Sequence, residues 1–341
     1  KFFDGNGYKL PDEVEDELEK YVRQSADNEL ARPTGDGIGK IEFNSNLAHL
    51  YAHFVRHTID TSLEGLTIVY DGANGAASSV GPEILSGLGA KVININVNPD
   101  GLNINDHCGS THIEGLQVAV QQHNADLGIA NDGDADRCLL VDEKGQVLDG
   151  DQIMLLCALK LKEEGKLKGD TIVGTVMSNI GFHKAAEELG MKTVSTAVGD
   201  RYVLEYMREH NLSVGGEQSG HVIFLDHNTT GDGMLTAVQV AALMKEKNQP
   251  LSELASIMTK YPQVLINVRV ATKTGWEDND IIKAAIVTAE GELGDEGRVL
   301  VRASGTEPLI RVMAEGPNQE ELQALCQEIA DIIGREQGLA D

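Results

Sequence analysis

The sequence predicts an α/β protein with two successive α/β domains of mixed, mostly parallel sheets, a C-terminal α+β domain and the remnant of a first α/β domain. Two observations predict this class. Between residues 66 and 247, short β-branched segments alternate with segments whose apolar residues have helical spacing, which is typical of β-α-β units. After Pro262 strands flank helices without that regularity, as in small α+β domains. A chain of 341 residues is long enough for two or three domains with their own cores.

The first 45 residues have the pattern expected at the end of a domain. Pro11 followed by Asp12 is typical of a helix N-terminus, and we expect an acidic helix to about residue 24. A linker rich in glycine and proline follows at 32–37, and apolar residues then recur at helical spacing from Leu47 to Thr58. We predict four parts, with the boundaries 1–45, 46–149, 150–260 and 261–341.

Periodicity and turn residues predict the remaining elements in order. The second part should contain strands at 66–70 and 91–97, a helix at 114–124 and a strand-turn-strand around residue 132. The third part should contain strands at 171–175, 192–196 and 213–216 and helices at 152–164, 181–189, 201–210 and 232–247. The fourth should contain strands at 263–271, 298–302 and 309–315 and helices at 280–290 and 318–333. The small-residue loop at 71–76 fits either a phosphate at a helix N-terminus or a tight turn.

Composition limits the partners and the compartment. With 28 basic and 54 acidic residues, the formal charge of −26 argues against nucleic acid or an anionic membrane as a partner. A ligand with phosphate groups would need cations concentrated locally, so the positions of the arginines matter. The four cysteines are far apart in the sequence and form no C-x-x-C pair, which favours the reduced thiols of a cytoplasmic protein. No apolar run approaches the roughly 20 residues that span a membrane.

The most informative segment is an acidic loop between two short apolar runs, with Asp132, Asp134 and Asp136 at alternate positions. In an extended or gently turning backbone these side chains point the same way. Their carboxylates would repel each other in a partly dry site, and a divalent cation relieves that repulsion. Oxygen ligands alone favour Mg²⁺, Mn²⁺ or Ca²⁺ over zinc. Gly133 and Ala135 are small, which we interpret as room for a ligand.

Two other interpretations of this acidic loop stay open. One is a turn that merely caps a hairpin, although three spaced aspartates exceed what a turn needs. The other is an EF-hand, because the three aspartates and Glu143 match loop positions 1, 3, 5 and 12 of that motif. Position 6 of an EF-hand is glycine, whereas here it is Arg137, and the flanks have strand patterns. We therefore favour a divalent metal loop on a strand-turn-strand.

Two further loops have residues that suit a phosphorylated sugar. Arg302 and Arg311 bracket a Ser-Gly-Thr turn whose hydroxyls and N–H groups could converge on a phosphate, although the same residues also occur in ordinary hairpins. The loop at 215–221 combines a carboxylate, an amide, a hydroxyl and an imidazole between glycines, which suits vicinal hydroxyls. A capping turn would contain the same residue types.

Together these loops resemble the α-D-phosphohexomutase family over the whole chain, and four motifs occur in the family's order. These are the metal loop at 132–137, the third-domain specificity loop at 199–202, the sugar-binding loop at 216–221 and the phosphate-binding loop at 302–308. Within the family, Gln218 and the segments at 101–111 and 261–268 are similar to those of the phosphoglucosamine mutases. Phosphomannomutase/phosphoglucomutases more often have methionine in place of Gln218, and they are the alternative.

The resemblance implies that glucosamine 6-phosphate and glucosamine 1-phosphate interconvert through a phosphoserine enzyme and a bisphosphate intermediate. It implies one Mg²⁺ per chain on the three aspartates, a phosphorylated hexosamine as ligand, and a homodimer as one assembly to consider. The implied catalytic residues are Lys1, as general acid/base, and Arg137, beside the transferred phosphoryl group. The implied substrate-binding residues are Asp200, Arg201, Glu217, Ser219, His221, Arg302, Ser304, Gly305, Thr306 and Arg311.

One departure from the family concerns the phosphoserine. In the family this serine precedes a segment whose lysine matches Lys1, so we expect that the chain as written has neither the serine nor most of the first domain. On that expectation the chain alone would be inactive as a mutase. A non-catalytic fragment that binds phosphosugars is then a second hypothesis beside the enzyme.

Overall fold

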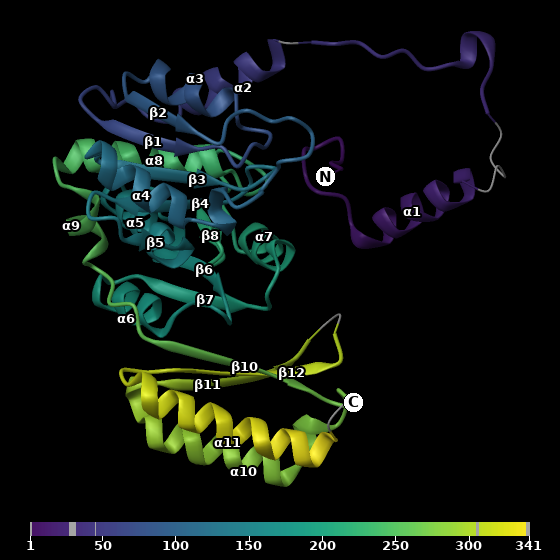
Figure 1. The fold of residues 1–341 in the computed structure, drawn as a ribbon, viewed down its shortest axis with the longest axis vertical. Coiled ribbons are helices and arrows are strands. Elements are labelled where there is room, and N and C mark those ends of the chain that lie inside the picture. Colours follow the sequence, from purple (N-terminus) through teal and green to yellow (C-terminus); the bar gives the residue numbers. More distant parts are fainter. Residues whose placement is uncertain (1, 27–31, 45, 305–306, 339–341) are drawn as a thin grey trace. The chain divides into compact units, whose positions relative to one another are not determined.

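Two compact units make up the chain in the computed structural model (Figure 1). The first unit comprises Lys1–Thr175 and Thr196–Ala255, and the second comprises Val176–Ser195 and Ser256–Asp341. The structure describes residues 2–26, 32–44, 46–304 and 307–338. Helices and sheets build both units, and mixed sheets occur in the first, which confirms the predicted α/β class.

A five-stranded sheet of the first unit, in the order β2-β1-β3-β4-β5, holds the acidic loop. The strands β1 (Thr67–Asp71), β2 (Lys91–Ile95) and β3 (Leu127–Asn131) are parallel, whereas β4 (Cys138–Asp142) and β5 (Val147–Leu148) return antiparallel. Because β1 and β3 are parallel neighbours, the loops that follow Asp71 and Asn131 leave the sheet at the same edge.

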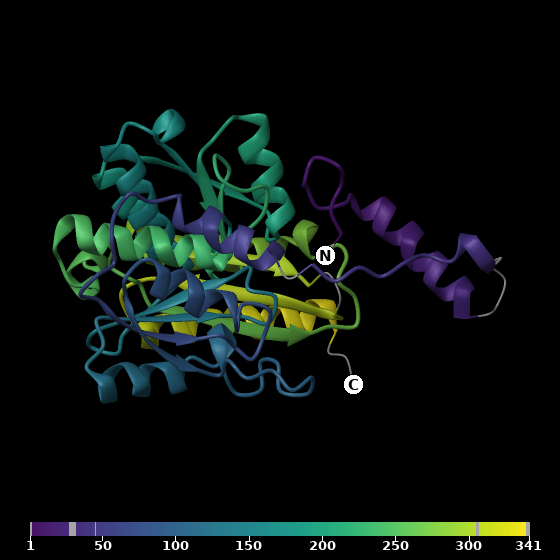
Figure 2. The same cartoon turned by 90° about the horizontal axis from the view of Figure 1, so that it is seen from above.

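Helices pack against the buried strands of this sheet. The helices nearby are α2 (Asn46–Arg56), α3 (Val80–Gly87), α4 (Glu114–His123) and α8 (Gly233–Lys247). Leu116 and Val120 of α4 pack against Val69 of β1 in a buried cluster. At Gly128 a Cβ would lie 2.6 Å from Val120 Cγ2, so only glycine lets α4 come this close. Helix α8 contacts β3 and β4 and forms one continuous helix (Figure 2).

The first unit continues with a second α/β arrangement. The strand β6 (Thr171–Thr175) pairs in parallel with β8 (Val214–Gly216), which pairs antiparallel with β9 (Val222–Phe224). The helices of this part are α5 (Gly150–Glu163), α7 (Asp200–Glu209) and the short α9 (Leu251–Ala255). Val203 and Met207 of α7 pack against Val173 and Ile223, which fixes α7 against the sheet. The predicted strands at 171–175 and 213–216 and the predicted helices at 152–164 and 201–210 correspond to β6, β8, α5 and α7.

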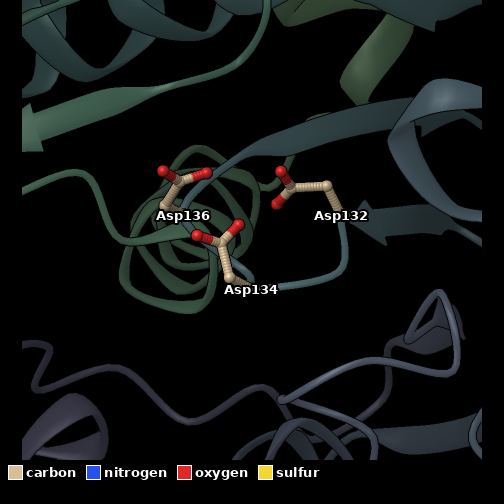
Figure 3. Close-up of side chains that lie close together, drawn as sticks. All are labelled: Asp132, Asp134 and Asp136. Carbon is tan, nitrogen blue, oxygen red and sulfur yellow. The ribbon is translucent and has the colours of Figure 1, made fainter. Parts of the chain in front are cut away.

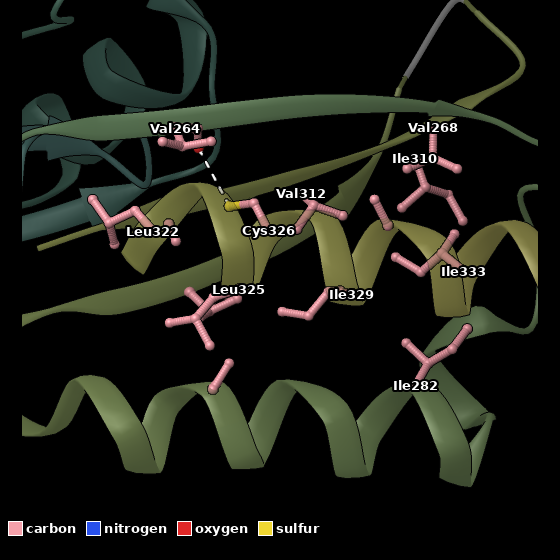
Figure 4. Packing of buried hydrophobic residues seen from close by; sticks show 14 of the residues in the cluster. Val264, Val268, Ile282, Ile310, Val312, Leu322, Leu325, Cys326, Ile329 and Ile333 are labelled. Carbon is pink, nitrogen blue, oxygen red and sulfur yellow. Dashed lines mark hydrogen bonds between the residues drawn. The ribbon is translucent and has the colours of Figure 1, made fainter. Parts of the chain in front are cut away.

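The second unit contains an antiparallel sheet in the order β10-β12-β11. Its strands are β10 (Gln263–Arg269), β11 (Arg298–Ala303) and β12 (Leu309–Glu315), and α10 (Asp280–Leu293) and α11 (Gln319–Gln337) cover one face (Figure 1). Figure 4 shows how the buried apolar side chains, among them Val312 and Ile329, fill the space between the sheet and these helices. The unit also contains α6 (Ile180–Glu188) and nearly all of β7 (Lys192–Thr196).

The amino-terminal part differs in one detail from the expectation. Helix α1 (Asp12–Ala26) is present as predicted, and before it Phe3 forms an isolated bridge with Lys9. Helix α2 also forms as predicted, yet its buried residues are Ala52 and Val55, while Leu47 and Leu50 are 61% and 64% exposed. The most apolar stripe of α2 is therefore not the one that packs within the described residues.

Candidate active site

The acidic loop is a hairpin turn between β3 and β4, as the strand-turn-strand pattern predicted. One carboxylate oxygen from each of Asp132, Asp134 and Asp136 lies within 4.8 Å of the other two (Figure 3). Asp132 is buried, Asp136 is half-buried and Asp134 is exposed, so the group opens to solvent on one side. Within the described ranges no other group of three or more histidine, cysteine or acidic side chains meets in this way.

The backbone brings the three carboxylates together. Asp132 O accepts a hydrogen bond from Ala135 N (3.1 Å), and its Oδ1 accepts one from Arg137 N (3.2 Å). Ala135 has a φ of 61°, in the left-handed region, which closes the turn. Our interpretation of Gly133 was wrong: a Cβ there would lie 2.8 Å from Asn105 Nδ2 and from Ile104 Cδ1, so neighbouring side chains occupy this space instead of a ligand.

The electrostatics of the loop favour a divalent cation. Burial raises the pKa of Asp132 to about 6, and repulsion from Asp136 and Asp134 acts in the same direction. Arg137 opposes this shift, since its Nε lies 3.8 Å from Asp132 Oδ2 and 3.9 Å from Asp136 Oδ1. One guanidinium against three carboxylates leaves excess negative charge. An all-oxygen set at these separations fits Mg²⁺, which one to three carboxylates and water can hold.

The loop at 217–221 joins β8 to β9 and is tied to the acidic hairpin through the backbone. Cys138 N donates to Gly220 O (2.9 Å), and Arg137 forms an isolated bridge with His221. Gly220 has a φ of 94°, and a Cβ there would lie 2.4 Å from Cys138 O. Glycine is required at this position for both reasons. The two loops that were predicted separately therefore form one surface of the first unit.

His221 is at the centre of this surface and is only 3% exposed. Its Nε2 lies 3.7 Å from Asp136 Oδ2 and 3.9 Å from Asp200 Oδ2. Gly231 covers the ring, because a Cβ there would lie 2.3 Å from Nε2. Glu217 Oε1 accepts a hydrogen bond from Gly199 N (3.0 Å), which joins the loop before α7 to the loop before β9.

The structure thus brings His221 beside Asp136 and Asp200, and Glu217 beside the loop that precedes Asp200. Ser219 is exposed in the same loop, and Arg201 Nε donates to Glu205 Oε1 (2.8 Å) within α7. A cavity lined by Lys9, Asp200, Arg201 and His221 adjoins these residues. A ligand in this part of the first unit would meet both acidic and basic hydrogen-bonding side chains.

In the second unit, β11 and β12 place Arg302 directly opposite Arg311. Burial lowers the pKa of Arg302, and the neighbouring positive charge of Arg311 lowers it further. Ser304 is buried, and its Oγ accepts a hydrogen bond from Glu307 N (3.3 Å). Two like charges held together in a half-buried site favour a bound anion. Three predicted site residues, Lys1, Gly305 and Thr306, lie outside the described residues.

The sequence interpretation missed two residues at the start of helix α8, Asp232 and Gly233, that support the acidic hairpin. Gly233 N donates to Ala135 O (3.0 Å), and a Cβ on Gly233 would lie 2.2 Å from Arg137 O. Asp232 caps α8 by accepting from Leu235 N (2.9 Å) and also accepts from Tyr51 Oη (2.7 Å). An aspartate between two glycines before a long apolar helix is an N-cap signal that could have revealed this support.

The loop at 71–76 is a tight turn rather than a phosphate cradle. The N–H groups of Ala73, Asn74, Gly75 and Ala76 all donate to protein oxygens. Helix α3 begins only at Val80, so these N–H groups are also not at its first turn. This resolves the two interpretations that the sequence left open in favour of the turn.

Comparison with known proteins gives consistent matches along the chain. The family models of phosphoglucomutase/phosphomannomutase match at 47–145 (alpha/beta/alpha domain II), 149–261 (alpha/beta/alpha domain III) and 265–332 (C-terminal domain). A phosphoglucosamine mutase of Symbiobacterium thermophilum is 54% identical over 338 residues, which cover 98% of this chain and 75% of the relative. A phosphoglucosamine mutase of Bacillus subtilis is 49% identical over 339 residues, which cover 99% of this chain and 76% of the relative.

Solved structures agree on the fold. A phosphoglucomutase/phosphomannomutase family protein of Burkholderia thailandensis superposes with a TM-score of 0.75 at 20% identity, covering 95% of this chain and 71% of that one. Aspergillus fumigatus N-acetylphosphoglucosamine mutase, in complex with GlcNAc-6P and magnesium, has a TM-score of 0.67 at 23% identity. The match covers 83% of this chain and 68% of that one. In the part of the chain that the structure describes, no helix is long and apolar enough to cross a membrane.

Proposed function

This chain belongs to the α-D-phosphohexomutase family of intramolecular phosphotransferases, and on that premise we propose that it serves the interconversion of glucosamine 6-phosphate and glucosamine 1-phosphate. Relatives about half identical along nearly the whole chain, each named phosphoglucosamine mutase, support this assignment over other hexose phosphates. The observation that carries the chemistry is the cluster of three aspartates beside His221 and Arg137.

In this proposal the metal loop prepares the phosphoryl group for transfer. Asp132, Asp134 and Asp136 hold one Mg²⁺, which when bound neutralises charge on the transferred phosphoryl oxygens. Arg137 is the catalytic residue that stabilises the same oxygens, and its Nε is oriented by the carboxylates of Asp132 and Asp136. The loop is rigid enough for this role, because its backbone is fixed on both sides by hydrogen bonds.

The loops at 199–201 and 217–221 recognise the sugar. We assign the sugar hydroxyls to Glu217 and Ser219 and the positioning of the ring to Asp200, Arg201 and His221. The hydrogen bond from Gly199 N to Glu217 supports this assignment, since it aligns the two loops before a ligand arrives.

The loop at 302–311 recognises the phosphate that does not react, through Arg302, Ser304, Gly305, Thr306 and Arg311. The opposed pair Arg302 and Arg311 supports this role, because burial and the charge of Arg311 lower the pKa of Arg302 and a bound dianion would offset both effects. The proposal keeps Lys1 as the general acid/base and the predicted division into 46–149, 150–260 and 261–341. The four free cysteines support a reducing compartment, and we propose the cytoplasm.

Two measurements test the proposal. Calorimetry of the chain with Mg²⁺ should show tighter binding of glucosamine 6-phosphate than of glucose or mannose 6-phosphate. Phosphorus NMR, on protein in which the family's serine segment precedes residue 1, should then show glucosamine 1-phosphate forming from the 6-phosphate. Turnover of glucose or mannose phosphates without turnover of glucosamine 6-phosphate would contradict the substrate assignment. Binding without turnover would favour a phosphosugar-binding role.

A further inference from the structure

Asp71, at the end of β1, is a fully buried carboxylate that the proposed chemistry does not use. Its Oδ1 accepts a hydrogen bond from Ala73 N (2.9 Å), and its Oδ2 accepts from Gly109 N and from Asn96 Nδ2 (both 3.0 Å). Burial raises the pKa of Asp71, while these three donors act in the opposite direction. A carboxylate that is buried at such a cost needs a structural or functional reason.

The first donor belongs to a loop, residues 72–78, that rests on the metal loop. Ala76 N donates to Gly133 O (2.8 Å), and a Cβ on Gly75 would lie 2.3 Å from the same oxygen. Ala73 itself has a φ of 52°, which costs an alanine about 1 kcal/mol. The hydrogen bond from Ala73 N to Asp71 helps to hold this unfavourable conformation.

The other two donors belong to a second loop, residues 96–109, that touches the metal loop from another side. Gly109 has a φ of 70°, and a Cβ there would lie 2.4 Å from Asn131 O. Asn105, whose N–H donates to Ala73 O (2.9 Å), fills the space beside Gly133 together with Ile104. The two loops are therefore joined to each other and to the residues on both sides of Asp132.

Asp71 accepts hydrogen bonds from both loops, and it can do so because it is a carboxylate. A carboxylate offers acceptor sites on both oxygens, so it can satisfy one donor on Oδ1 and two on Oδ2. An asparagine of the same shape would turn an amide NH₂ toward at least one of these N–H donors. That contact would lose a hydrogen bond and add a repulsion between two donors.

We propose that Asp71 is a positioning residue for the metal loop: through the loops 72–78 and 96–109 it holds Asn131 and Gly133 so that Asp132 faces Asp134 and Asp136. This inference rests on the metal site of the proposed function. Without the cation, the three carboxylates repel each other, and a loosely held loop would relax by separating them. Mg²⁺ would then have to reorganise the loop on binding, which weakens its affinity.

Three variants test the proposal by calorimetric titration with Mg²⁺ and by thermal unfolding in EDTA. Asp71→Asn should weaken Mg²⁺ binding about tenfold, the lower range for partners that orient ligands indirectly. Asn96→Gly removes one donor and keeps the positive φ of 52° at this position, and it should weaken binding by a smaller factor, about threefold. The matched control is Asp126→Ala: Asp126 Oδ2 accepts from Thr67 N (2.8 Å) at the opposite end of β1. Loss of this acceptor should lower the unfolding temperature and leave Mg²⁺ affinity unchanged.

The outcomes separate positioning from general stability. If Asp71→Asn folds and binds Mg²⁺ like the unmodified chain, as Asp126→Ala should, Asp71 is merely structural and the proposal is wrong. If Asp71→Asn does not fold, the Mg²⁺ affinity of Asn96→Gly decides, and an affinity equal to that of the unmodified chain overturns the proposal. An unmodified chain that binds no Mg²⁺ at all would instead overturn the metal site, and this inference with it.

Discussion

In the proposed metal site, protons and Mg²⁺ would compete for the same carboxylate oxygens of Asp132. Burial and the neighbouring Asp136 raise the pKa of Asp132 to about 6, so this ligand is partly protonated in a pH range where an exposed aspartate would be fully ionised. A protonated carboxyl group is a poor ligand for a hard cation. We therefore expect Mg²⁺ affinity to fall as the pH is lowered through 6.

The magnitude follows from the pKa. With a pKa of about 6, roughly 1% of Asp132 is protonated at pH 8 and about nine tenths at pH 5, so the apparent Mg²⁺ affinity should fall about tenfold between these values. The stability of the metal-free protein should instead decrease as the pH rises. The pKa of Asp132 in the folded protein lies above its unfolded value of about 3.9, so Asp132 contributes fully to the free energy of unfolding below pH 4. This contribution is lost as the pH rises through 6.

The assay is calorimetric titration of the chain with Mg²⁺ from pH 5 to 8 at constant ionic strength, together with unfolding temperatures in EDTA and in saturating Mg²⁺. The gain in unfolding temperature from Mg²⁺ should increase with pH. Asp132→Asn should bind weakly with no such pH dependence. The control Asp142→Asn alters an aspartate whose Oδ1 accepts from Lys144 N and Gln146 N at 2.9 and 2.8 Å, and it should keep the full dependence. An affinity of the unmodified chain that stays constant within a factor of two from pH 5 to 8 would refute the reasoning.

Three further predictions concern single positions. Asp134→Asn removes one exposed carboxylate and should weaken Mg²⁺ binding about tenfold with the unfolding temperature in EDTA unchanged; equal affinity would show that Asp134 is no ligand. Arg302→Gln relieves the repulsion with Arg311, so the phosphate-free protein should keep or gain stability, while calorimetric affinity for a phosphosugar falls at least tenfold. Loss of stability with unchanged affinity would exclude a phosphate role. Gly220→Ala should cost about 2 to 4 kcal/mol in chemical denaturation, because the Cβ meets a carbonyl oxygen. The control Gly101→Ala, with a similar φ of 91° and open space, should cost about 1 kcal/mol, and equal costs would contradict the steric argument.

Local patterns predicted the elements well where one segment alone decides the outcome. The strands at 171–175, 192–196 and 309–315 have the predicted bounds, because branched residues between turn residues determine them. The acidic hairpin belongs to the same class, since its three carboxylates are within five residues of one another. Periodicity placed helix α2 correctly but not its buried face, because burial depends on what packs there.

Contacts between distant segments could not be predicted in this way. His221 reaches Asp136 and Asp200 only because β4, α7 and β9 converge in the folded first unit. Asn105 and Gly133 are far apart in the sequence, and nothing in either segment indicates that one fills the space beside the other. Two glycines gave the strongest unused signal: Gly75 and Gly109 each mark a close approach to a backbone oxygen, but glycine in a sequence indicates freedom as readily as contact.

The two candidate ligand loops share one physical principle with opposite signs of charge. In the first unit the hairpin between β3 and β4 holds three carboxylates together, and in the second unit the register of β11 and β12 holds Arg302 against Arg311. In each case backbone hydrogen bonds fix the geometry. Burial and, after it, the repulsion between like charges shift the pKa values, raising that of Asp132 and lowering that of Arg302. A cation in the first and an anion in the second relieve this repulsion. Because the chain has a net charge of −26, the proposed binding of an anionic sugar phosphate requires such a local concentration of positive charge.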